Sequence, residues 1–395
     1  MTFLAFDPLA ILQAAVPFLA ILVVLVVIHE FGHFLAAKAF GIKVLEFGIG
    51  FPPRAWTFLR KGETEYTLNW LPIGGFVRLL GEEDPTDPRS LAAQAAWKRL
   101  AVMSAGVVMN LVTAIVLLAV GFMVPRERAL TMAQILEVAP DSPAAQARVE
   151  GVMRDGSAPS PGLQPGDIVL EVEGKEVRNT SELVYANRLH LGESQRWVIN
   201  RGGATLVAYV YARWDPPPGQ GPTGVRIGPP ASCSTDAEGN PVSCQLLYPY
   251  TEKVWDWPWE AFPRALVSLA ETFRLAVNEV RVLVSGTSGA SMSTGQPALT
   301  GPVGIAETTG NIISEQGWRP LIELAALLSL NLAIFNALPI PMLDGGRMLF
   351  VVIEILRGGR RIAPEKEALV HFMGFALLLF GVLVVTYFDI ARIVS

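Results

Sequence analysis

Four long apolar stretches dominate the pattern of hydrophobic and polar positions along the chain. They cover roughly residues 9–37, 100–124, 321–356 and 368–388, and each is near or above the ~20 residues that cross a bilayer as a helix. The pattern therefore predicts four transmembrane helices, which we place within residues 1–40, 100–124, 321–356 and 367–390.

The segments between these stretches have other periodicities. Residues 41–99 read as short extended runs broken by Gly and Pro, and residues 65–70 alternate at the period of a strand, which predicts β-hairpins. Residues 260–284 place polar side chains on one helical face and follow three tryptophans, which predicts a helix on the outer membrane surface. Residues 215–249 and 286–300 are rich in small residues and Pro, so loops are expected there.

Composition supports a membrane protein. The chain has 395 residues, 51% of them hydrophobic, and a net charge of only -5, which favours membrane lipid as its surroundings and gives no sign of a nucleic-acid partner. Lys and Arg gather in residues 38–99 and 357–366, and basic loops stay in the cytoplasm. The two termini and residues 125–320 are therefore expected outside, where Cys233 and Cys244 can either pair or remain free thiols.

The candidate chemistry lies in the first apolar stretch, in the sequence His29-Glu30-Phe31-Gly32-His33. Two His four residues apart share one face of a helix and can bind one metal ion, and the intervening Glu can take a proton from water. A structural His pair is the alternative. Residues 9–28 contain no ionisable side chain, and ionisable groups within a membrane are expensive and usually functional, so we favour the metal.

A catalytic zinc site uses three protein ligands, so a third must come from elsewhere. The residues considered are Glu323, Asp344, Glu354, His371 and Asp389. Depth along the predicted spans disfavours Glu323, Glu354 and Asp389 and leaves Asp344 and His371 open. Asp344 follows a Pro- and Gly-rich run, residues 336–346, that breaks a helix at mid-membrane, where free backbone groups need protein or water around them.

These motifs together resemble the site-2 protease family of intramembrane zinc metalloproteases, most closely its bacterial branch of the regulator of sigma-E protease type. The resemblance rests on the His29 to His33 motif, Ala105-Gly106 through Asn110, residues 301–306, Asn331 and the pattern NxxPxPxLDGG over residues 336–346. It covers nearly the whole chain.

The resemblance implies a ligand set of His29, His33 and Asp344 for Zn²⁺, with Glu30 as the catalytic acid and base. It further implies that substrate is positioned by a second group, namely Asn331, Asn336, Pro339, Pro341, Gly75 and Phe76. For Asn336 a cap at the helix break is an equal alternative. The residues around Gly75 and Phe76 are expected in a membrane-associated β-structure that adds the substrate as an extra strand.

Outside the membrane, residues 129–213 resemble a PDZ domain, with a helix start at residues 142–145 and a Gly-Leu turn leading into residues 166–169. Residues 148–161 are an insertion relative to that pattern. The remaining outer segment, residues 214–300, is expected to be a linker with the amphipathic helix.

The fold class expected is thus a polytopic α-helical membrane protein with four transmembrane helices, a β-hairpin region and an extracytoplasmic PDZ (α+β) domain. The function expected is peptide-bond hydrolysis in or near the spans of single-pass membrane proteins in the bacterial inner membrane. Typical family substrates are anti-sigma factors and signal-peptide remnants. The alternatives are a catalytically silent scaffold that binds peptides through its PDZ domain and, less favoured, a zinc transporter.

Overall fold

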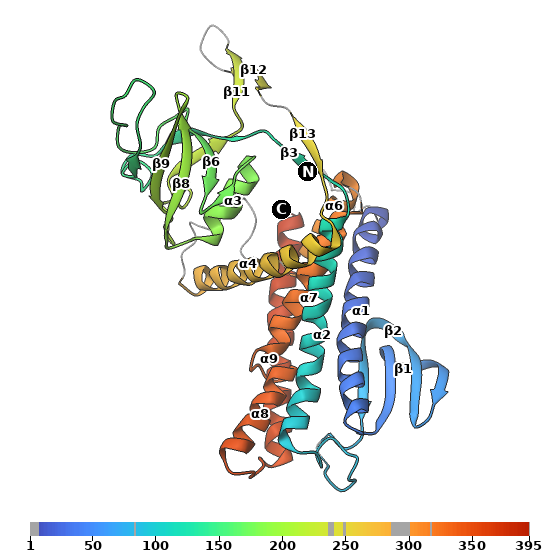
Figure 1. The fold of residues 1–395 in the computed structure, drawn as a ribbon. Coiled ribbons are helices and arrows are strands. Elements are labelled where there is room, and N and C mark those ends of the chain that lie inside the picture. Colours follow the sequence, from blue (N-terminus) through green and yellow to red (C-terminus); the bar gives the residue numbers. More distant parts are fainter. Residues whose placement is uncertain are drawn as a thin grey trace. The chain divides into compact units, whose positions relative to one another are not determined.

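The computed structural model describes residues 8–82, 84–235, 241–247, 250–285, 301–316 and 318–394. The chain divides into two compact units (Figure 1). The first, called the helical unit here, comprises residues 1–123, 258–269 and 299–395. The second, called the sheet unit, comprises residues 124–257 and 270–298.

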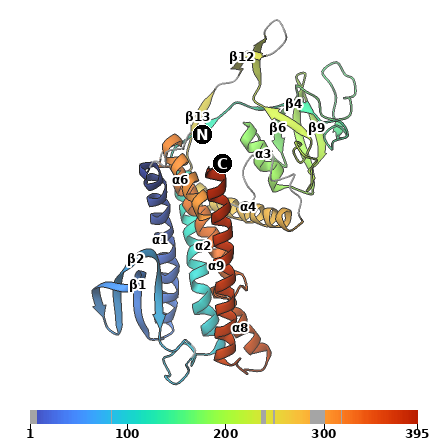
Figure 2. The same ribbon diagram turned by 180° about the vertical axis from the view of Figure 1, so that it is seen from behind.

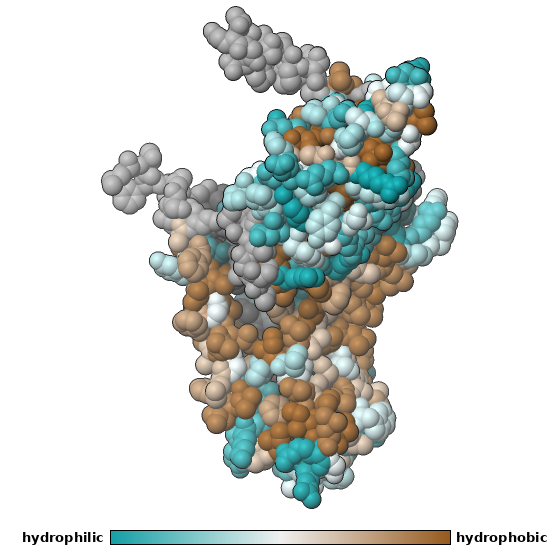
Figure 3. Space-filling model, turned by 90° about the vertical axis from the view of Figure 1, so that its left-hand side faces the viewer, coloured by the Kyte–Doolittle hydropathy of each residue, from teal (hydrophilic) through white to brown (hydrophobic). Residues whose placement is uncertain are grey.

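Four helices of the helical unit are long and apolar enough to cross a membrane, counted over the described ranges. They lie in α1 (Pro8–Ala39), α2 (Ala96–Met123), α7 (Pro320–Ala337) and α9 (Pro364–Val394). Large apolar side chains on α9 are exposed, among them Leu377 and Phe380, and hydrophobic residues cover much of this unit in Figure 3. Exposed apolar surface of this extent suits lipid rather than water.

The third predicted span is interrupted. α7 ends at Ala337, and α8 (Asp344–Leu356) begins only after a turn that contains the two prolines. Met342 in this turn has a positive φ of 81°, and its backbone N–H donates to Nδ1 of His371 on α9 at 2.7 Å. The break in the helix is thus held by a side chain from the last span, so backbone freed by the prolines finds a partner inside the protein.

A further helix, α6 (Pro302–Gln316), precedes the third span and lies beside α1 (Figure 1). Asp389, which is buried near the end of α9, accepts a hydrogen bond from the backbone N–H of Gly304 at 2.9 Å. A carboxylate at this position satisfies an N–H of the first helical turn, which has no partner within the helix.

The predicted hairpin region forms one sheet from two long, bent strands, β1 (Val44–Lys61) and β2 (Thr64–Leu79). Both ends of β2 pair with the first part of β1, because Ile49 lies opposite Gly75 and also opposite Leu68. The last segment of β2 lies beside α1, as Figure 2 shows from behind. This places residues 75–79 next to the helix that carries the His-Glu-Phe-Gly-His motif.

The sheet unit is built on an antiparallel sheet in the order β10-β4-β6-β8-β9-β5, with β7 paired to β6. Its core surrounds the fully buried Trp197, with Ile135 and Leu183 among its neighbours, and α3 (Thr180–Leu189) packs on β4 and β6. The strands are β4 (Ala133–Val138), β5 (Arg148–Glu150), β6 (Ile168–Val172), β7 (Lys175–Glu176), β8 (Ser194–Arg201), β9 (Ala204–Tyr211) and β10 (Val225–Gly228).

Two expectations for this unit were wrong. Residues 142–145 form turns instead of starting a helix, because β5 begins at Arg148 and pairs with β9 at the edge of the sheet. Residues 215–249 are not loop throughout, since they contain β10, which pairs with β4, and the paired strands β11 (Ala231–Thr235) and β12 (Pro241–Leu246). The partners that make these segments strands are distant in sequence, so local composition does not indicate them.

Two further features belong to the outer segment. β3 (Arg126–Ala129) pairs with β13 (Thr251–Val254), which joins the two ends of the sheet unit's main segment. In the paired strands β11 and β12, Cys233 lies directly opposite Cys244, so the expectation that these residues can pair remains a prediction. The loop expected at residues 286–300 lies outside the described residues.

The helix expected at residues 260–284 is α4 (Pro258–Ser285). In its first part Ala261 and Ala265 pack on Ala119 of α2 within the helical unit. In its second part the polar face binds the sheet unit, where Asn278 Nδ2 donates to the Arg188 carbonyl at 2.9 Å and Arg281 lies over the Trp214 ring. Asn278 and Arg281, which belong to the predicted polar face, therefore contact protein.

Candidate metal centre

The site is built on α1, whose apolar sequence forms a continuous helix through the His-Glu-Phe-Gly-His motif. His29 and His33 lie one turn apart on the same face, and only 7% of each residue is exposed. Their Nε2 atoms are 3.2 Å apart. The spacing of four residues thus brings two imidazole nitrogens together, as the helical period requires.

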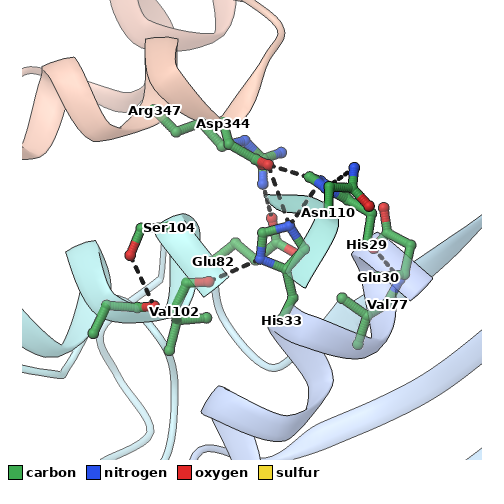
Figure 4. Close-up of polar contacts among 11 residues, drawn as sticks. His29, Glu30, His33, Val77, Glu82, Val102, Ser104, Asn110, Asp344 and Arg347 are labelled. Atoms are coloured by element: carbon green, nitrogen blue, oxygen red, sulfur yellow. Dashed lines mark hydrogen bonds and ion pairs between the residues drawn. The ribbon is translucent and has the colours of Figure 1, made fainter. Parts of the chain in front are cut away.

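Asp344, the first residue of α8, completes a three-residue cluster (Figure 4). Its Oδ2 atom lies 2.9 Å from Nε2 of His29 and 3.2 Å from Nε2 of His33. One turn later on α8, Arg347 forms an ion pair of 2.8 Å with Glu82, in the segment that follows β2. The break before α8 therefore turns the Asp344 carboxylate toward α1, and the Arg347 pair holds the first turn of α8 in place.

Two glycines, Gly32 on α1 and Gly106 on α2, let α2 approach this cluster closely. A Cβ atom on Gly32 of α1 would come within 3 Å of the Ala105 carbonyl group of α2, and one on Gly106 would lie 2.6 Å from Cε1 of His29. Both distances are shorter than real Cβ contacts, so any side chain at Gly32 or Gly106 would force the helices or the imidazoles apart.

Each imidazole has a partner on α2 through its other nitrogen. His33 Nδ1 lies 2.8 Å from the Val102 carbonyl oxygen, and His29 Nδ1 lies 3.2 Å from Nδ2 of Asn110. Outer partners of this kind fix the orientation of a metal-binding imidazole and decide which nitrogen carries its proton. Figure 4 shows both Nε2 atoms directed to the side where Asp344 lies.

Glu30 lies beside the cluster and faces β2. Its Oε2 atom accepts a hydrogen bond from the Val77 backbone N–H at 3.1 Å, and a Cβ on Gly75 would lie 3.8 Å from Cγ of Glu30. One carboxylate oxygen is thus held by the strand, which leaves Oε1 to exchange a proton. Gly75 and Phe76, predicted from the sequence, lie in this same segment of β2.

The other residues considered as a third ligand lie elsewhere. Glu354 forms a buried ion pair of 2.7 Å with Arg99, Asp389 accepts from Gly304, and Glu323 lies 3.4 Å from Arg319. His371 accepts from the Met342 backbone and so supports the turn before Asp344. Over the described ranges, His29, His33 and Asp344 are the group whose ligand atoms converge, all within 4.8 Å of one another.

The predicted substrate-positioning residues of the third span do not join the cluster. Asn331 and Asn336 lie on α7 and are half-buried, whereas Pro339 and Pro341 lie in the turn between α7 and α8. Neither asparagine amide has a hydrogen-bond partner among the residues that the structure describes. Both amides can therefore bond to another molecule.

The donor set fits a zinc ion. Two imidazole nitrogens and one carboxylate oxygen are a ligand set that zinc enzymes use, with a fourth position left for water or substrate. A carboxylate that is shielded from solvent needs a compensating positive charge. A cation bound by this carboxylate and by the two imidazole nitrogens would supply that charge.

Comparison with known proteins identifies the family. The sequence profile described as Peptidase family M50 matches residues 17–381. The chain belongs to this family of site-2 proteases. It is similar to the zinc metalloprotease RasP of Geobacillus kaustophilus, at 28% identity over 96% of this chain and 98% of the relative. It is also similar to the regulator of sigma-W protease RasP of Bacillus subtilis, at 26% identity over 96% and 99% of the two chains.

Membership in Peptidase family M50 settles the class of reaction. The chain is a zinc metalloprotease with Zn²⁺ as its cofactor, it is a multi-pass membrane protein, and its activity is intramembrane proteolysis. The family therefore favours the enzyme over the scaffold and over the transporter considered from the sequence.

The sequence analysis gave no role to three residues that contact the cluster, although two of them, Gly106 and Asn110, were among those that carried the resemblance. Val102, Gly106 and Asn110 follow one another at intervals of four along α2 and meet the two imidazoles. An Asn within an apolar span at helical spacing from a Gly was the available signal, because polar side chains in a membrane need a reason. The Val77 amide, being backbone, left no such signal.

Proposed function

We propose that His29, His33 and Asp344 hold the zinc ion and that Glu30 is the acid and base of peptide hydrolysis. The observation that carries the proposal is the convergence of the three ligand atoms within 4.8 Å, with Glu30 one residue from His29 on the same helix. When bound, zinc supplies Lewis-acid chemistry, which makes water acidic enough to attack at neutral pH and polarises the scissile carbonyl.

The protein's own groups then move the protons. Glu30 takes a proton from the attacking water at Oε1, since Oε2 is engaged by the Val77 N–H. It delivers that proton to the amine as the peptide bond breaks, so one carboxylate serves first as base and then as acid. The strand contact keeps the Glu30 side chain in one orientation through both transfers.

The last segment of β2 is proposed as the platform for the substrate. A transmembrane helix hides its carbonyls in its own hydrogen bonds, so the cleaved stretch must be extended before it can react. Residues 75–79 run along α1 beside Glu30, and an extended substrate added at this edge would gain main-chain hydrogen bonds there. The third span is proposed to help position the substrate. Its polar groups are the amides of Asn331 and Asn336 on α7, and Pro339 and Pro341 determine the shape of the following turn.

A pair of variants at Val77 tests the contact between β2 and Glu30. Val77→Pro removes the backbone N–H, whereas Val77→Ala keeps it and only shortens the side chain. We expect Val77→Pro to lower the cleavage rate at least tenfold while it retains zinc, and Val77→Ala to remain close to the wild type. Equal rates for the two variants would show that the Val77 N–H is not needed to hold Glu30.

For the sheet unit we propose a PDZ-like domain that screens substrates. An antiparallel sheet with α3 packed on β4 and β6 suits that domain class. The insertion at residues 148–161 begins with β5, which is the edge strand at the other side of the sheet from β10. A hollow of about 260 Å³ lies between α3 and β6–β7, with Val172, Val177 and Tyr185 among its lining. Such a hollow suits an apolar side chain from a trimmed chain end.

The cellular setting is inferred from charge and family. We propose the bacterial inner membrane, with the N-terminus and the sheet unit outside, because basic residues concentrate in the two loops assigned to the cytoplasm. A relative is named as a regulator of sigma-W protease, which supports anti-sigma factors as substrates. Signal-peptide remnants, being short single spans, are the second substrate class proposed.

Cleavage of paired substrates tests this function. A single-pass protein is offered to the purified enzyme in detergent, once with its folded outer domain and once with that domain removed, and products are located by mass spectrometry. We expect cuts within or next to the span and faster cleavage of the trimmed form. Cuts only in the soluble part, or equal rates for both forms, would contradict the substrate proposal.

A further inference from the structure

One face of α2 serves both imidazoles of the cluster. Val102, Gly106 and Asn110, each four residues after the last, meet His33 and His29. Figure 4 shows Val102 beside His33 and Asn110 beside His29. The Val102 carbonyl can only accept a hydrogen bond, so His33 must donate from Nδ1. Its Nε2 atom then carries a lone pair and faces Asp344, as a metal ligand must.

His29 has a different kind of partner. Asn110 is fully buried, and its Nδ2 atom lies 3.2 Å from Nδ1 of His29, while its Oδ1 atom is buried with no partner among the described residues. With Nδ2 as donor, Nδ1 of His29 accepts and the imidazole proton sits on Nε2, 2.9 Å from Oδ2 of Asp344. In that arrangement Nε2 donates to Asp344 and has no lone pair for a metal.

The unpaired Oδ1 atom of Asn110 can gain a hydrogen-bond partner by rotation of the amide. Rotating the Asn110 amide by half a turn exchanges Nδ2 and Oδ1, and Oδ1 can then accept from a protonated Nδ1 of His29. The rotation gives this oxygen a bond that it lacks and moves Nδ2 to the place that Oδ1 leaves. The imidazole stays neutral, because one proton leaves Nε2 and one is bound at Nδ1.

We propose that Asn110 is a positioning residue that selects the His29 tautomer required for zinc binding. With Oδ1 toward His29, the proton is held at Nδ1 and the Nε2 lone pair points at the ligand cluster. This inference rests on the proposed ligand set and deepens it. An apolar side chain at this place would accept no hydrogen bond from Nδ1, whereas an amide oxygen or a carboxylate would.

Ser329 offers a control at the same level of the bundle. Its Oγ atom donates to the Asn110 backbone carbonyl at 2.8 Å, so it ties α7 to α2 without touching the imidazole. Removing this hydroxyl disturbs helix packing around Asn110 but leaves the amide of Asn110 unchanged. The two effects of altering Asn110, on packing and on the tautomer, can thus be separated.

The test is the zinc affinity of the full-length protein in detergent, measured by competition with a chromophoric chelator. Loss of an outer partner of a metal-binding His typically costs ~10–100-fold in affinity. We expect Asn110→Leu to lose about that much, Asn110→Asp to stay within about threefold of the wild type because its carboxylate accepts from Nδ1, and Ser329→Ala to remain unchanged.

Each outcome has a separate meaning. If Asn110→Leu binds zinc as tightly as the wild type, or if Asn110→Asp loses as much affinity as Asn110→Leu, the positioning role is wrong. Thermal unfolding of each variant is followed alongside, and Asn110→Ala, which also removes the acceptor, replaces Asn110→Leu if that variant does not fold. If instead Asp344→Asn keeps full zinc affinity, the ligand set itself fails, independently of Asn110.

Discussion

Two carboxylates, Asp167 in the sheet unit and the half-buried Asp344 in the helical unit, have opposite kinds of partner. In the sheet unit Asp167 receives Arg201 through two bonds of 2.8 and 2.7 Å, and the Gln164 backbone N–H donates to it as well. In the helical unit Asp344 meets the imidazoles of His29 and His33. A guanidinium brings its own charge and protons, so the first cluster is complete.

Under the proposed ligand set, the second cluster is completed by a cation. Neutral imidazoles offer lone pairs, and these converge on the same point as the Asp344 carboxylate. The comparison teaches that burial of a carboxylate does not by itself indicate a functional site. What matters is whether its neighbours balance the charge or leave donor atoms aimed at a common position.

The largest effect is expected from Asp344→Asn. An amide of the same shape has lost the charge that holds a metal, so we expect stoichiometric zinc to be lost and cleavage to become undetectable. Metal analysis by mass spectrometry and a cleavage assay check both results. Asp167→Asn is the matched control, and it should retain full zinc.

Asp167→Asn should instead weaken the sheet unit. It leaves Arg201, which also donates to the Gly162 carbonyl, as a buried charge without its counter-ion, and breaking such a pair costs ~3–5 kcal/mol. Hydrogen exchange of the full-length protein should show lost protection in β6 and β8, with α1 and α2 unchanged. Unchanged protection in β8 would mean that the pair is not structural.

Removal of zinc should act in the other unit. Ligand binding stabilises the state that binds it, by about 2.7 kcal/mol when free zinc is 100-fold above its dissociation constant. A chelator should therefore reduce hydrogen-exchange protection around His29 and Asp344 and leave the sheet unit as it was. An equal loss of hydrogen-exchange protection in both units would show that the two carboxylate clusters do not differ in their need for zinc.

A smaller effect is expected from Gly106→Ala. The added methyl would lie 2.6 Å from Cε1 of His29, so the imidazoles must shift, and we expect a loss of zinc affinity of about tenfold, or ~1.4 kcal/mol. Gly121→Ala on the same helix is the control, because its methyl would meet its nearest neighbour at 3.7 Å. Equal affinities for the two variants would show that the close approach of α2 is not needed.

Much of the helical unit could be predicted from the sequence alone. Apolar length predicted four spans, and the interval of four between His29 and His33 predicted their shared face, because both depend on the local period of a helix. The third ligand could not be chosen from the residues, since the approach of Asp344 to α1 depends on packing between helices. His371 remained open for that reason, and its contact with Met342 has no local signature.

The sheet unit was harder to predict. β10 and β5 are short strands whose partners, β4 and β9, lie far along the chain, so a Pro- and Gly-rich composition suggested loops. The amphipathic pattern of residues 260–284 predicted the helix α4, and the structure shows that Asn278 and Arg281 on this helix contact protein. Periodicity predicts that a face is polar and says nothing of what covers it.

The central claim is that Glu30 performs the proton transfers beside a zinc ion held by other residues. Glu30→Gln keeps the side-chain shape and removes the base, and acid and base catalysis contributes ~10²–10⁴-fold. We therefore measure cleavage of a trimmed single-pass substrate together with bound zinc, for the wild type and this variant. The account predicts full zinc and a rate at least 100-fold lower for the variant; cleavage at the wild-type rate by Glu30→Gln would contradict it.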